Sequence, residues 1–153
     1  MIWFEDLPVG RQDRYGSIAV TREDMLDFAR KFDPQPFHLN DDAAAANPIF
    51  GRLAASGWHT AAMGMRLTAD FWADAGSSDA ILGGAGIDEL RWLTPVYAGD
   101  TLRAEAEVVE ARASASKPEL GVVRFRTTLY NQDDVAVMRH LSNVLIRRRP
   151  GGF

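Results

Sequence analysis

The sequence contains no cysteine. Disulfide frameworks, thiolate zinc sites and cysteine nucleophiles are therefore excluded, because each of them requires that side chain. Histidine is scarce as well: His38, His59 and His140 are the whole complement, and they lack the close spacing typical of metal ligands. We therefore expect no metal site, and no zinc-dependent or cysteine-dependent chemistry.

Long apolar runs and an excess of positive charge are also missing. No apolar stretch is long enough to span a bilayer, and residues 1–6 lack the basic start and apolar run of a signal peptide, so we expect a cytoplasmic protein with no membrane partner. The net charge is −4 and the pI is near 5.3, which argues against nucleic acid as a partner. The one basic run, Arg147-Arg148-Arg149, is expected to be a solvated tail.

The remaining composition is that of a globular protein, with 46% hydrophobic and 25% charged residues among 153. This length suits one hydrophobic core, so we predict a single domain over residues 1–153. Apolar residues recur first with helical and later with alternating period. Helices are expected at 22–32, 42–46 and 57–73, and strands at 14–20, 80–93, 101–108, 123–129 and 135–147.

The helix over 57–73 is apolar around most of its circumference, which predicts that it is buried nearly all round. The later strands are expected to follow one another in antiparallel succession. One buried helix with one long antiparallel sheet is an α+β architecture. We therefore predict a hot-dog fold, in which the sheet wraps around the long central helix.

A stiff connection follows the first long helix. Asp33-Pro34 ends that helix, and Pro36 constrains the backbone again, so residues 33–38 are expected to form a rigid, extended loop. Asp33 and His38 at the ends of this loop are candidates for general acid–base chemistry, because a free aspartate and a free imidazole have pKa values of about 3.9 and 6.5. Their spacing alone favours a helix stop followed by a helix-entry histidine over a catalytic pair.

The segment Phe32-Asp33-Pro34-Gln35-Pro36-Phe37-His38, together with residues 54–59 and 90–102, resembles the MaoC-like dehydratase family, which includes the (R)-specific enoyl-CoA hydratases. The likeness extends over roughly residues 5–148. It implies a hot-dog fold, a homodimer or higher homo-oligomer, and reversible syn addition of water to a trans-2-enoyl thioester. It implies no cofactor, with coenzyme A entering only as part of the substrate.

The resemblance also assigns roles to residues. The family's catalytic pair falls on Asp33 and His38, and the backbone N–H of Gly57, at the start of the long helix, is the candidate oxyanion donor. A glycine there would let the thioester carbonyl approach closely. The candidate substrate-binding residues are Gln35, Phe37, Arg52, Ser56 and Trp58. The family often has asparagine in place of Gln35 and histidine in place of Ser56.

Two other functions remain open from the sequence. The first is an acyl-CoA thioesterase on the same fold, which would place an acidic residue near the central helix. Asp70 and Asp74 are the acids of that helix, and both lie far from its N-terminus. The second is a non-catalytic subunit that binds an acyl thioester, against which the intact Asp33 and His38 pair argues.

Overall fold

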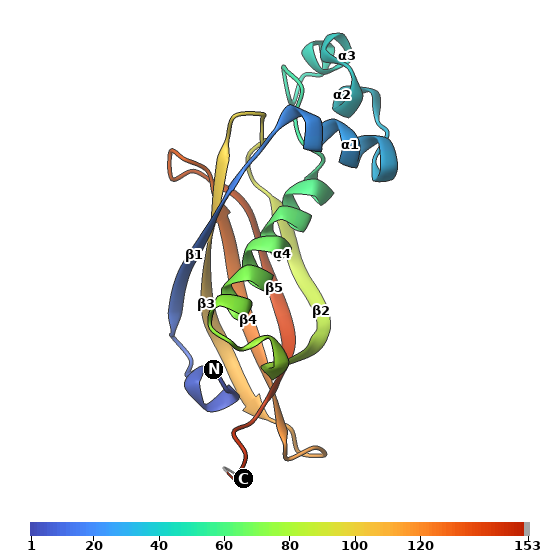
Figure 1. Ribbon diagram of the computed structural model, residues 1–153. Coiled ribbons are helices and arrows are strands. Elements are labelled where there is room, and N and C mark those ends of the chain that lie inside the picture. Colours follow the sequence, from blue (N-terminus) through green and yellow to red (C-terminus); the bar gives the residue numbers. More distant parts are fainter. Residues whose placement is uncertain (152–153) are drawn as a thin grey trace.

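The computed structural model describes residues 1–151, in which one antiparallel sheet of five strands curves around one long helix (Figure 1). This is the predicted α+β hot-dog architecture. The helical elements are η1 (Phe4–Asp6), α1 (Arg22–Phe32), α2 (Pro36–Leu39), α3 (Asp41–Ala46), α4 (Gly57–Asp74) and η2 (Ser78–Ala80). The strands are β1 (Gln12–Ala19), β2 (Ile81–Trp92), β3 (Thr101–Ala113), β4 (Leu120–Tyr130) and β5 (Ala136–Arg147).

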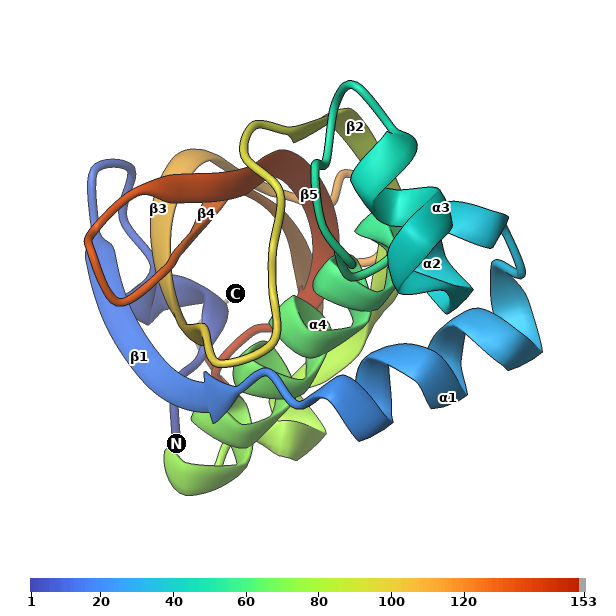
Figure 2. The same cartoon turned by 90° about the horizontal axis from the view of Figure 1, so that it is seen from above.

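Helix α4 lies in the hollow of the curved sheet (Figure 2). Two glycines allow this close packing. A Cβ on Gly64 would come within 2.9 Å of the Leu129 side chain, and one on Gly16 within 2.6 Å of Leu67. The sheet covers only part of the helix, however, because Trp58 is 57% exposed. The expectation of burial nearly all round is therefore wrong for this single chain. No helix in residues 1–151 is long and apolar enough to cross a membrane.

The strand order is β1-β3-β4-β5-β2, so β2 pairs with β5 and not with the strand that follows it in the chain. The predicted succession is wrong at this point. Periodicity identifies strands, but it does not say which strands pair, and neighbours in sequence are neighbours in the sheet only about two-thirds of the time. Residues 93–100 therefore cross an open end of the sheet (Figure 2). Gly83 and Gly86, both with positive φ, lie at irregularities of the β2–β5 register, as expected for bulges.

The segment expected to be an extended loop is partly helical. Its residues from Pro36 onward form the short helix α2, which contains His38. Proline is well suited to the first position of a helix, since its missing N–H would have no partner there and its φ is already helical. The prolines thus order this segment as expected, but the second one starts a helical turn.

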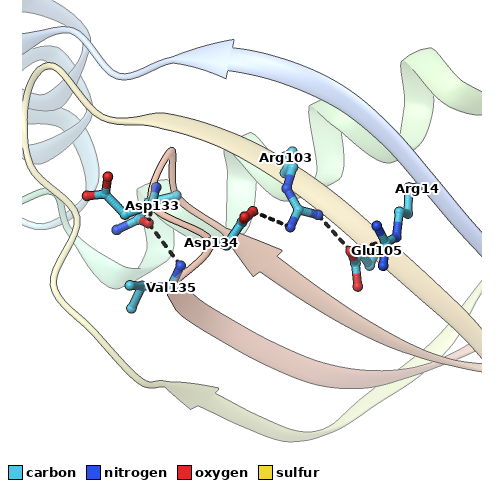
Figure 3. A network of polar contacts seen from close by, with 7 residues as sticks. Arg14, Arg103, Glu105, Asp133, Asp134 and Val135 are labelled. Atoms are coloured by element: carbon cyan, nitrogen blue, oxygen red, sulfur yellow. Dashed lines mark hydrogen bonds and ion pairs between the residues drawn. The ribbon is translucent and has the colours of Figure 1, made fainter.

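The basic C-terminal run is not a solvated tail. Arg148 Nε lies 2.9 Å from Glu5 Oε1, and Arg149 lies 2.7 Å from Asp6 Oδ1. Both acidic partners belong to η1, so this run ties the last strand to the beginning of the chain. The outer face of the sheet carries similar pairs, with Arg103 bonded to both Asp134 and Glu105 (Figure 3). Such exposed pairs contribute only about 0–1 kcal/mol each.

His59, on α4, is packed against α1. Its ring stacks on Phe28 with centroids 4.9 Å apart, and it is only 8% exposed. Its buried Nδ1 has no hydrogen-bond partner among residues 1–151. Burial lowers the pKa of His59, and Asp24 offsets part of this effect. Burial also lowers the pKa of the partly buried His140 on β5.

Because of these two histidines, we expect the free energy of unfolding to fall in mild acid. Because their pKa values lie below the unfolded value of about 6.5, the folded protein binds fewer protons than the unfolded chain. The contribution of these two histidines to the free energy of unfolding is therefore fully present above about pH 6.5. It is lost as the pH falls through their lowered pKa values. We expect His59 to account for part of the loss in the free energy of unfolding between pH 7 and pH 5.

Urea denaturation of the wild type and of His59→Phe at both pH values would measure this contribution. Phenylalanine preserves the stacking on Phe28 but cannot take up a proton. The free energy of unfolding of the variant should change less with pH than that of the wild type. The same pH dependence in both proteins would show that His59 does not titrate as its burial implies.

Candidate active site

Three polar side chains from different elements meet at the N-terminal end of α4. Asp33 follows α1, His38 belongs to α2, and Ser56 is the N-cap of α4. Asp33 Oδ2 lies 3.4 Å from His38 Nε2 and accepts a 2.7 Å hydrogen bond from Ser56 Oγ. His38 and Ser56 are 5% and 1% exposed, whereas the Asp33 side chain keeps 20% of its surface. Solvent therefore reaches this cluster from the side of the carboxylate.

A backbone carbonyl determines which ring nitrogen of neutral His38 carries the proton. Nδ1 lies 2.9 Å from the carbonyl oxygen of Ala54, which can only accept a hydrogen bond. Nδ1 must therefore carry the proton, and in the neutral ring Nε2 has a free lone pair. That lone pair and the ionised carboxylate of Asp33 are two acceptors that face each other. A single water molecule can donate one proton to each of them.

The local fold explains why these groups meet. The carbonyl of Asp33 accepts from the N–H of Gln35 at 2.8 Å, and the carbonyl of Gln35 accepts from the N–H of His38 at 2.9 Å. These tight turns reverse the chain, so Asp33 and His38 face each other in spite of the residues between them. The rings of Phe37 and Phe50 lie 4.6 and 5.6 Å from the His38 ring and restrict its movement.

Gly57 is the first residue of α4, and its N–H has no hydrogen-bond partner among residues 1–151. The next N–H, that of Trp58, is bonded to Ser56 Oγ at 3.2 Å. The fold supplies a further reason for glycine at this position. A Cβ at this position would lie 2.5 Å from Cε2 of Trp92, whose Nε1 donates to the Gly57 carbonyl at 2.8 Å. The indole of Trp92 occupies the space that a side chain at position 57 would need.

The remaining predicted binding residues surround this cluster in different ways. The side chain of Gln35 is exposed and makes no hydrogen bond to Asp33 or to any other part of residues 1–151. Arg52 stacks 3.8 Å above the ring of Tyr97, whose hydroxyl donates to the Phe50 carbonyl at 2.7 Å. Trp58 packs edge-on against Trp92, with centroids 5.1 Å apart.

Sequence reasoning missed two groups at the site. The Ala54 carbonyl carries no side-chain signal, so only the folded backbone could reveal that it fixes the His38 tautomer. Trp92 belongs to the strand expected over residues 80–93, and nothing in that pattern indicates that its indole lies against Gly57 and is 46% exposed. Within residues 1–151, no group of three histidine or acidic side chains is arranged to hold a metal ion.

Comparison with known proteins gives consistent matches along the chain. A family model described as "MaoC like domain" matches residues 6–130. The uncharacterized protein YdeM of Bacillus subtilis is 30% identical over 145 residues, which cover 94% of this chain and 98% of that protein.

Two solved structures extend this similarity. The MaoC-like dehydratase from Rhodospirillum rubrum has 38% sequence identity and a TM-score of 0.87, covering 98% of this chain and 99% of that one. The R-hydratase from Pseudomonas aeruginosa has 25% identity and a TM-score of 0.72, covering 97% and 87%. This similarity over nearly the whole chain confirms the hot-dog fold.

Proposed function

This chain belongs to the MaoC-like domain family, a family of hydratases and dehydratases, and we propose that it adds water reversibly to a trans-2-enoyl thioester of coenzyme A. One observation carries the proposal. His38 Nε2 and Asp33 Oδ2 are two hydrogen-bond acceptors 3.4 Å apart, and the Ala54 carbonyl keeps the proton of neutral His38 on its other nitrogen. This arrangement suits the binding and deprotonation of one water molecule.

The reaction can be written with these groups alone. The bound water loses a proton to His38 Nε2 as its oxygen forms a bond to C3, while Asp33 holds the water in place. Negative charge that develops on the thioester oxygen is stabilised by the unpaired N–H of Gly57. His38 then returns the proton to C2. Because the hydroxyl group and the proton arrive from the same side, the addition is syn, and the reverse sequence is dehydration.

The predicted binding residues are proposed to hold the rest of the substrate. Phe37, Trp58 and Gln35 lie next to the catalytic cluster in the chain and are proposed to contact the acyl group and the thioester. Arg52 is proposed to contact a phosphate of the carrier. Its guanidinium makes no ion pair with a carboxylate in residues 1–151, and its stacking on Tyr97 orders the side chain.

The Arg52 assignment predicts a loss of affinity that depends on the carrier. Arg52→Ala should raise KM for an enoyl-CoA about tenfold with little change in kcat, because a charge-assisted hydrogen bond to phosphate is lost. The KM for the matching enoyl-pantetheine, which has no phosphate, should be unchanged. Arg52→Lys keeps the charge and is the matched control. An equal rise in KM for both thioesters would contradict a phosphate contact.

A homodimer is part of this proposal. Strand β2 is an edge of the sheet, and large apolar side chains of this strand are exposed, including Ile87 at 56% and Trp92 at 46%. An unprotected edge strand favours association with another strand. Sedimentation equilibrium should give at least twice the chain mass, and a monomeric mass at micromolar concentration would contradict this part.

A single assay separates the proposed reaction from its alternatives. The purified protein is incubated with trans-2-enoyl-CoAs of different chain length, and the conjugated enoyl absorbance and the release of free thiol are followed in parallel. We expect absorbance to fall without thiol release. Thiol release would instead support a thioesterase, and no change with any chain length would support a non-catalytic role.

A further inference from the structure

The Ser56 side chain connects helix α4 to the Asp33 carboxylate through two hydrogen bonds. Its Oγ donates to Asp33 Oδ2 at 2.7 Å and accepts from the Trp58 N–H at 3.2 Å. The side chain is only 1% exposed. A hydroxyl group has one proton, and here that proton is already used. Ser56 therefore has no donor left for a substrate, and the structure argues against the substrate-binding role expected from the sequence.

The direction of these two hydrogen bonds has an electrostatic consequence. The Trp58 N–H belongs to the first turn of α4, where the helix dipole has its positive end. Accepting from this N–H polarises the hydroxyl group, which makes it a better donor to the carboxylate. A hydrogen bond of this kind favours the ionised form of an acid. It also fixes the orientation of Asp33, since Oδ2 is held by Ser56 while facing His38.

We propose that Ser56 is a positioning residue, which aims Asp33 Oδ2 at His38. This inference rests on the proposed hydratase function and refines it. With Asp33 held in this orientation, His38 is the group that carries the proton between water and C2. Asp33 orients the water and stabilises the imidazolium that forms. The buried Ser56 hydroxyl thus assigns proton transfer to His38 and orientation of the water to Asp33.

Ser56→Ala tests the proposal by kinetics. Losing a hydrogen bond to a charged group should lower kcat by roughly 10-fold to 100-fold. The KM should change little, because Ser56 does not contact the substrate. The acid limb of the pH–rate profile should move to higher pH, since losing a hydrogen-bond donor disfavours the ionised form of an acid. Ser56→Thr, which retains a hydroxyl group, should restore most of the activity and the original acid limb.

A matched control separates this role from helix capping. Thr21 is the N-cap of α1, where its Oγ1 accepts from the Asp24 N–H at 3.1 Å. Thr21 and Asp33 lie at opposite ends of α1, so Thr21→Ala removes a helix cap away from the site. This variant should have a lower melting temperature but an unchanged acid limb of the pH–rate profile. If Ser56→Ala only lowered the melting temperature in the same way, with an unchanged pH profile, Ser56 would be a cap and the proposal would be overturned.

A second measurement needs no activity. The ¹³C signal of the Asp33 carboxyl group, assigned by its loss in Asp33→Asn, is followed against pH in the resting protein. Its titration midpoint should be higher in Ser56→Ala than in the wild type, because the carboxylate has lost a hydrogen-bond donor. An unchanged midpoint would overturn the proposal even in an active hydratase. A shifted midpoint in a protein that hydrates no enoyl thioester would instead support the Ser56 contact and refute the proposed function.

Discussion

His38→Asn is expected to lower kcat for enoyl-thioester hydration by about 10²–10⁴-fold, the usual range for a lost general base. Asparagine removes the base at this position while keeping one of the two hydrogen-bonding groups of histidine. Its amide nitrogen lies approximately where Nδ1 of the imidazole lies, so it can still donate to the Ala54 carbonyl, which is 2.9 Å from Nδ1 in the wild type. The variant keeps this buried hydrogen bond to Ala54 but has no basic nitrogen facing Asp33. Steady-state kinetics with an enoyl-CoA substrate would measure the effect.

Two further measurements make this prediction decisive. Circular dichroism and thermal unfolding should show that His38→Asn is folded, since the buried carbonyl keeps its partner. His38→Gln places an amide near the position of Nε2 and should be equally inactive, because an amide is not a base at neutral pH. Full activity in either folded variant would remove His38 from the mechanism.

Asp33→Asn is expected to lower kcat by a similar factor, about 10²–10⁴-fold. The amide is nearly isosteric with the carboxylate, but it has one acceptor oxygen and carries no charge. It can accept from Ser56 or orient the water, and it cannot stabilise an imidazolium on His38, whose Nε2 lies 3.4 Å from Oδ2. Initial rates measured at saturating substrate would give the change in kcat.

The double variant shows whether the two groups act on one water. If they do, Asp33→Asn combined with His38→Asn should be about as inactive as the worse single variant, because residues that act as a unit are strongly non-additive. Multiplied losses would mean that Asp33 and His38 contribute to separate steps. That result would contradict the shared water while leaving both residues catalytic.

Local signals in the sequence predicted local structure well. Helix α1 spans Arg22–Phe32, as the periodicity predicted, and Thr21 and Ser56 cap α1 and α4 directly before apolar helical runs. Arg66 and Asp70 form an ion pair at 2.9 Å on α4, which their spacing of four residues favours. Each of these features depends on residues within about one helical turn, which is the distance over which periodicity and capping patterns carry information.

Features that depend on distant segments were not predictable in this way. The pairing of β2 with β5 joins strands that are far apart in the chain, and no composition signal specifies it. The contact of Trp92 with Gly57 also joins distant residues, so the sequence does not show that this indole requires a glycine. The site itself was predicted from a family resemblance, whereas the Ser56 contact with Asp33 came only from the fold.

The central claim is that Asp33 and His38 together activate one water molecule for addition to an enoyl thioester. Its most direct test is the fall in conjugated enoyl absorbance when wild type, Asp33→Asn and His38→Asn are each mixed with the same trans-2-enoyl-CoA. The account predicts rapid loss of absorbance without thiol release for the wild type, and rates lower by about 10²–10⁴-fold for both folded variants. Wild-type rates in both variants, or thiol release by the wild type, would contradict it.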